Sequence, residues 1–180
     1  PFLKDGEVVV GQAAAILLYL APTLKLVGRS EQLRVWTHQI QLTIADLVAE
    51  AHDTHHPVGS GLYYEDQKPE ALRRAQDFCR TRLPKYLLWF ESIVARNPAG
   101  PRHLVGGKLS YADLSLFQLI EGLRYAFPKA AASALSKSTP ATCASVTGRT
   151  FRSSTPSVSM THWTHTPKSA LNSTADCPAW

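Results

Sequence analysis

The sequence has no long hydrophobic run and few cysteines. Its longest apolar stretch, residues 13–21, is far shorter than the roughly 20 residues that a membrane span requires, so no membrane association is expected. Cys79, Cys143 and Cys177 are odd in number and widely spaced, which predicts neither a disulfide framework nor paired metal ligands. Cys79 is expected to be a small core residue, and the expected location is the reducing cytoplasm.

The last 50 residues contain almost no acidic side chains. Residues 131–180 hold 19 serines and threonines but one acid, Asp176. Residues 1–130 hold 10 serines and threonines and 13 acids. This abrupt change predicts a boundary near residue 130. Residues 131–180 are expected to be an irregular or disordered tail, or to be translated in a shifted reading frame.

A strong excess of either charge is also absent from the first part. The whole chain has a formal net charge of +5, but residues 1–130 hold 15 basic and 13 acidic side chains. This near balance does not predict the basic stripe that binds nucleic acid. A cluster of bases between residues 73 and 85 lies on a predicted helix that also carries Glu70 and Asp77, and it is expected to be a solvated helix face. The members of that cluster are Arg73, Arg74, Arg80, Arg82 and Lys85.

The first 22 residues carry the signals of a strand, a turn, a strand and a helix. Asp5-Gly6 is a hairpin signal between two short apolar runs. Residues 13–20 are rich in Ala and Leu, and Pro22 ends the predicted helix. Two strands and one helix are too small to form a stable core alone. Because the chain begins with Pro1 rather than Met, we expect it to be a fragment of a larger protein.

Three longer helices are predicted after residue 30. Ser30 begins the first, whose apolar stripe runs to about residue 52. The second spans about residues 69–96, with a kink at Pro84. A surface loop over 97–107 precedes the third helix, where Ser110 and Asp113 have the spacing of a capping box and Pro128 marks the end.

Together these residues resemble the glutathione S-transferase family. The turn Gly11-Gln12-Ala13 after a β-strand resembles the end of its thioredoxin-like domain, and the box at Ser110 resembles that of its sixth helix. The resemblance implies a mainly α fold. Its expected parts are a partial thioredoxin-like β-β-α remnant (residues 1–24), an all-α C-terminal domain (residues 30–130) and the tail (residues 131–180).

The resemblance also implies a site for glutathione at Pro1, Gln12 and Ala13. In the family, Pro1 matches a proline beside glutathione, and a Glu/Gln-Ser pair holds the γ-glutamyl group; Ala13 stands where Ser is usual. The alternative is that Gln12 and Ala13 merely begin a helix. The family's catalytic Tyr, Ser or Cys lies earlier than Pro1, so no catalytic residue is assigned. Tyr19 is expected in the core.

The remaining candidates lie near residue 50. His52, His55 and His56 have a spacing that can bind zinc, but no cysteine is close, so no metal is expected. They are interpreted as favourable partners of a helix C-terminus or as the edge of an electrophile pocket. Asp46 and Asp53 are weaker candidates for contacting glutathione across a homodimer.

The implied parent activity is conjugation of glutathione to a small apolar electrophile. The chain as written is expected to lack this activity. The alternatives are a non-catalytic helical protein–protein interaction module, and a non-functional product whose helices leave their apolar faces open. For the tail, residues 136–143 shifted by one base yield Glu-Lys-Tyr-Pro under one codon choice, which is similar to the family's next helix.

Overall fold

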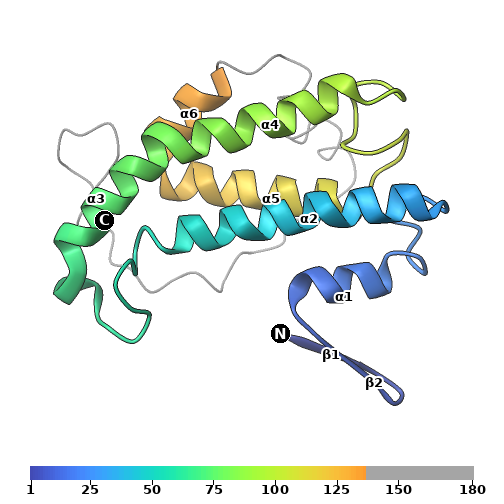
Figure 1. The fold of residues 1–180 in the computed structure, drawn as a ribbon, viewed down its shortest axis with the longest axis horizontal. Helices are drawn as coiled ribbons and strands as arrows, with labels where there is room; N and C mark the ends of the chain where they lie inside the picture. The colour runs from blue at the N-terminus through green and yellow to red at the C-terminus, as the bar shows by residue number, and fades with distance from the viewer. Residues whose placement is uncertain (137–180) are drawn as a thin grey trace.

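A computed structural model describes residues 1–136 of the 180-residue chain. The described part is a helical bundle with a small β-β-α unit at its N-terminal end (Figure 1). The elements are β1 (Phe2–Asp5), β2 (Val8–Gly11), α1 (Ala13–Leu20), α2 (Glu31–His52), a 3₁₀ turn η1 (Tyr64–Gln67), α3 (Lys68–Asp77), a π-helical turn η2 (Phe78–Arg82), α4 (Leu83–Arg96), α5 (Tyr111–Ala126) and α6 (Pro128–Ser136).

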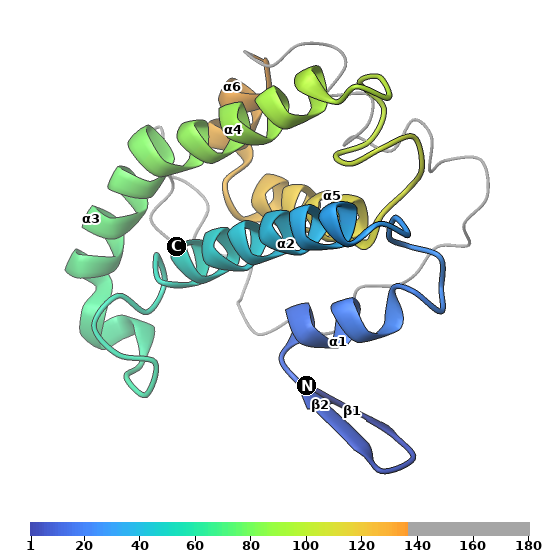
Figure 2. The same ribbon diagram turned by 45° about the vertical axis from the view of Figure 1, so that its right-hand side comes forward.

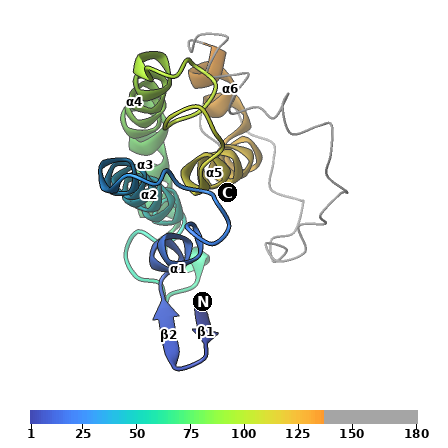
Figure 3. The ribbon, with the colours of Figure 1, turned by 90° about the vertical axis from the view of Figure 1, so that its right-hand side faces the viewer.

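The two strands form an antiparallel hairpin, as the sequence predicts. Asp5 pairs with Val8 across a two-residue turn, and Gly6 has a φ of 56°. A positive φ at the first central position, with none at Glu7, is the arrangement of a type II′ turn. The hairpin extends away from the helices, and α1 lies between it and α2 (Figures 2 and 3).

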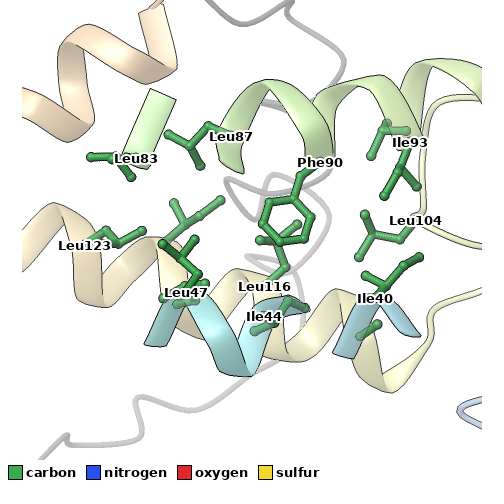
Figure 4. Packing of buried hydrophobic residues seen from close by; sticks show 14 of the residues in the cluster. Ile40, Ile44, Leu47, Leu83, Leu87, Phe90, Ile93, Leu104, Leu116 and Leu123 are labelled. Carbon is green, nitrogen blue, oxygen red and sulfur yellow. The ribbon is translucent and has the colours of Figure 1, made fainter. Parts of the chain in front are cut away.

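The core lies between α2, α4 and α5, whose apolar stripes face one another. Leu83, Leu87, Phe90 and Ile93 project from α4 toward residues of α2 and α5 (Figure 4). The apolar stripes on the helices that begin after Ser30 and Ser110 are therefore largely buried, whereas Leu33 and Trp36 at the start of α2 stay exposed. The buried members from α2 and α5 are Ile40, Ile44, Leu47, Ala112, Leu116, Leu119, Ile120 and Leu123.

The predicted second helix is divided where Pro84 interrupts it. Pro84 has no backbone N–H to donate to the preceding turn, and the chain forms a π-helical turn directly before α4. The N–H of Leu83 donates to the carbonyl of Phe78, five residues back. The predicted kink is confirmed, and π-helical turns of this kind are often associated with functional sites.

Two expectations need correction. The loop over residues 97–107 is not wholly on the surface, because Leu104 and Val105 are buried in the core. The last helix of the described residues, α6, runs to Ser136, beyond the boundary placed at residue 130, and Ala131 is buried. Cys79 packs against the core, as expected of a small core residue. The other two cysteines lie outside the described residues, as does the tail from residue 137 onward.

Within residues 1–136, no helix is long and apolar enough to cross a bilayer.

Candidate functional site

The connection between β2 and α1 has an unfavourable backbone conformation. Gln12 has φ 66° and ψ 124°, and a positive φ is costly for a residue with a Cβ atom. Strain of this kind costs on the order of 1–3 kcal/mol and is concentrated at binding and catalytic sites. Gln12 is exposed, so no buried contact of its side chain accounts for this conformation.

The N-terminus of α1 has no side-chain cap. Gln12 accepts the first helical hydrogen bond through its carbonyl, from the N–H of Ile16 at 2.9 Å, but its side chain makes no capping bond. The N–H groups of the first turn are thus left without intrahelical acceptors. Free N–H groups and the positive end of the helix dipole favour an anion such as a carboxylate at this position.

The hairpin register brings the three predicted site residues to one end of the β-β-α unit. Phe2 pairs with Gly11, so Pro1 and Gln12 occupy neighbouring positions just beyond the last pair of the ladder. Ala13 follows as the first residue of α1. All three are exposed, and the exposed surface here combines a proline, an amide side chain and an uncapped helix N-terminus.

The tyrosines occupy other positions. Tyr19 was expected in the core, but 38% of it is exposed and its hydroxyl donates to Asp5 Oδ2 at 3.0 Å. The expectation fails because α1, which packs against the hairpin and α2, contains no buried residue. That hydrogen bond raises the pKa of Tyr19, with smaller contributions from desolvation and the Asp5 charge. Tyr111 is fully buried at the start of α5, and burial raises its pKa.

The three histidines gather after the C-terminal end of α2. His52 and His56 stack with ring centroids 5.5 Å apart, and His55 Nδ1 lies 3.0 Å from His56 Nε2. Among residues 1–136, no group of three or more His, Cys, Asp or Glu side chains has a geometry that could hold a metal ion. Asp46 is exposed on α2, and Asp53 lies 3.8 Å from His52.

One polar cluster is not apparent from the sequence. Arg82, expected to be on a solvated face, instead donates twice to Glu50, from Nε at 2.7 Å and from Nη2 at 2.6 Å. Tyr86 donates to the same carboxylate at 2.7 Å. The Arg82 guanidinium lowers the pKa of Glu50, an effect that burial opposes and Tyr86 reinforces. This cluster links α2 to the π-helical turn and α4.

Comparisons with known proteins agree with this architecture. The family model "Glutathione S-transferase, C-terminal domain" matches residues 52–147, more than half of the chain. The structure of the Onchocerca volvulus Pi-class glutathione S-transferase matches 82% of this chain and 62% of its own with a TM-score of 0.62, at 24% identity. The fold is therefore that of a glutathione S-transferase.

Curated sequences support the same conclusion. Glutathione S-transferase P from Bos taurus is 28% identical over 123 residues, 67% of this chain and 51% of the relative. Glutathione S-transferase 2 from Onchocerca volvulus is 30% identical over 124 residues, 67% of this chain and 52% of the relative. The chain belongs to the glutathione S-transferase family, and it spans about half the length of the curated relatives it matches.

Proposed function

We propose that the chain carries part of a glutathione site, formed by Pro1, Gln12 and Ala13. The observation that carries the proposal is the strained, exposed Gln12 at the uncapped N-terminus of α1. The γ-glutamyl carboxylate of glutathione is an anion that suits the free N–H groups of this turn. Family membership supplies the ligand, because the matched relatives are named glutathione S-transferases.

Replacing Gln12 by glycine tests this assignment and separates binding from folding. Glycine adopts a positive φ without strain, so the variant is expected to gain about 1 kcal/mol in the free energy of unfolding. If Gln12 contacts glutathione, the same variant loses affinity by about tenfold, the cost of one hydrogen bond to a charged group. Isothermal titration calorimetry and urea denaturation measure the two effects.

The matched control for this variant is Gln32→Gly, on the exposed first turn of α2. It removes the same side chain at a distant helix start, and we expect no change in glutathione affinity. Should Gln12→Gly bind glutathione as tightly as the unchanged chain, Gln12 merely begins α1 and the site assignment is wrong.

We further propose that the 180-residue chain alone does not conjugate glutathione to electrophiles. The resemblance places the thiol-activating Tyr, Ser or Cys at a position that the 180 residues do not include. Without a hydrogen bond to the thiolate, the glutathione thiol keeps an ordinary pKa and little of it is ionised at neutral pH. A purified chain is therefore expected to show no turnover of a chlorodinitrobenzene-type substrate above background. Turnover that exceeds background and is saturable in glutathione would contradict this.

A non-catalytic interaction module of the same fold is the second candidate. It is favoured by the helical bundle, because the core cluster of the described residues contains no residue of the hairpin. Affinity for glutathione distinguishes the two, because a module used only for docking has no need of the site at Gln12. We also propose, from family membership alone, that the chain forms homodimers, which size-exclusion chromatography with light scattering tests directly.

A further inference from the structure

The segment between α2 and α3 is closed by one fully buried side chain, Gln67. Its Oε1 accepts from the N–H of Val58 at 3.0 Å and of Gly59 at 3.4 Å. The two protons of its Nε2 are shared among the carbonyls of Gly59, Leu62 and Tyr63, which lie at 3.1, 3.3 and 3.5 Å. Because backbone N–H groups only donate and carbonyls only accept, these partners fix the orientation of the amide.

The same amide also contacts His56. Gln67 Nε2 also lies 3.3 Å from His56 Nδ1. Since Nε2 can only donate, Nδ1 must carry a lone pair, which places the proton of a neutral His56 on its Nε2. That proton faces His55 Nδ1 at 3.0 Å, which then accepts. The closed arrangement therefore requires that both imidazoles are neutral.

Charged and titratable groups from each neighbouring element surround this pair. His52 from α2 stacks on His56, and Tyr64 from η1 stacks on His55 with ring centroids 4.4 Å apart. Burial lowers the pKa of His55, followed by the charges of His56 and His52, while Glu65 opposes them. Two further charged groups among the described residues are Asp53, 3.8 Å from His52, and Lys68, 5.6 Å from the Tyr64 ring.

We propose that residues 56–67 form a proton-sensitive clasp, closed by Gln67 when His56 is neutral and opened when the His55–His56 pair takes up a proton. A proton on His56 puts an N–H at Nδ1, directly against the N–H of Gln67 Nε2. A proton on His55 occupies Nδ1 of that ring and forces the proton of His56 from Nε2 to Nδ1. Both cases end with two donors facing each other at Gln67.

The direction with pH follows from this geometry. The closed form favours neutral imidazole, so the open form binds the proton more readily. The clasp is fully formed above the ordinary histidine pKa of about 6.5 and loses stability as pH falls below that value. Opening frees the backbone N–H groups of Val58 and Gly59 from Gln67, and both then become accessible to hydrogen exchange.

Amide hydrogen exchange on the full 180-residue chain tests the proposal. Protection of the Val58 and Gly59 amides, corrected for intrinsic rates, is expected to fall about fivefold between about pH 7.5 and about pH 5.5, the effect of losing one net hydrogen bond. The amide of Phe127, bonded to the Leu123 carbonyl at 2.8 Å, reports global unfolding and is expected to keep its protection. Unchanged protection of Val58 and Gly59 across this range would overturn the clasp.

Three variants locate the effect. His56→Asn keeps an acceptor toward Gln67 but cannot take up a proton, so its protection is expected to be constant with pH. His103→Asn, in the loop before α5, is the matched control and should retain the response of the unchanged chain. Gln67→Leu should remove the protection of the Val58 and Gly59 amides at every pH. If this variant does not fold, the comparison of His56→Asn with His103→Asn still tests whether His56 controls the clasp. A pH response in His56→Asn equal to that of the unchanged chain would refute the role of His56.

Discussion

Replacement of Asp113 by alanine is expected to lower the free energy of unfolding by about 3 kcal/mol. The Asp113 carboxylate accepts from the N–H of Ser110 at 2.8 Å and from the N–H of Leu104 at 2.8 Å. In return, the Ser110 hydroxyl accepts from the N–H of Asp113 at 3.4 Å. Alanine leaves two partly buried N–H groups without acceptors and removes a negative charge from the positive end of the α5 dipole.

This carboxylate connects the cap to the core. Leu104, whose N–H it holds, is 2% exposed and packs among the residues of α2 and α4. The loop that carries Leu104 is also held by Asn97, whose Nδ2 donates to the carbonyls of His103 and Gly106 at 2.8 and 2.9 Å. Loss of Asp113 therefore weakens helix initiation and the seating of Leu104 together.

The matched control for Asp113→Ala is Glu31→Ala. Glu31 is the acid in the first turn of α2, but it is exposed and bonds to Arg34 in the same helix, at 3.4 Å. Its removal loses the interaction with the helix dipole but leaves no buried backbone N–H without an acceptor. We therefore expect Glu31→Ala to lower the free energy of unfolding by under about 1 kcal/mol. Urea denaturation followed by circular dichroism measures both variants. If the two variants lose the same free energy of unfolding, the capping box at Ser110 and Asp113 adds no stability beyond the helix-dipole interaction.

The parts of the fold that the sequence predicts well are those determined by neighbouring residues. Ser30 begins α2 and accepts from the N–H of Leu33 at 3.3 Å, and the box at Ser110 forms as expected. The division before Pro84 follows from one missing N–H group. In each case the interacting atoms lie within five residues of one another, so spacing alone identifies them.

The expectations that fail involve partners far apart in the sequence or the choice of a buried face. Leu104 and Val105 enter the core although their segment has the prolines and glycines of a surface loop. Residues 130–136 follow the change in composition, yet alanine has a high helix propensity and Ala131 packs inward. Composition indicates a change of character but does not define where a helix ends.

The candidate site is predictable in part for the same reason. The two-residue turn at Gly6-Glu7, which follows Asp5, fixes the register of the hairpin, and the register places Pro1 next to Gln12. The positive φ of Gln12 has no local signal, because glutamine is not a residue that favours this region. Only the structure reveals the strain that distinguishes this helix start from an ordinary one.

The cluster of Glu50, Arg82 and Tyr86 is the clearest long-range feature, and breaking it is expected to cost about 2 kcal/mol. Arg82→Met keeps much of the side-chain volume but leaves the Glu50 carboxylate with Tyr86 as its hydrogen-bonding partner. This expected loss of unfolding free energy is smaller than for a fully buried ion pair, because 34% of the Arg82 side chain and 19% of the Glu50 side chain are exposed.

Arg124→Met provides the matched comparison. Arg124 and Glu121 are joined by an equally short contact of 2.6 Å, but within one turn of α5 and with 36% and 40% of their side chains exposed. Loss of that pair is expected to cost under about 0.5 kcal/mol. If Arg82→Met is no more destabilising than Arg124→Met, the contact between α2 and the π-helical turn does not stabilise the bundle.

The two pairs also differ in their expected response to acid. Arg82 lowers the pKa of Glu50 in the folded chain, so the unfolded chain binds the proton more readily. The stabilisation by Glu50 is complete above the ordinary glutamate pKa of about 4.3 and is lost as pH falls through the lowered value. The difference in free energy of unfolding between the unchanged chain and Arg82→Met should therefore narrow as acid titrates Glu50. A difference that stays constant down to about pH 2.5 would show that the Glu50 charge is not the source of the stabilisation.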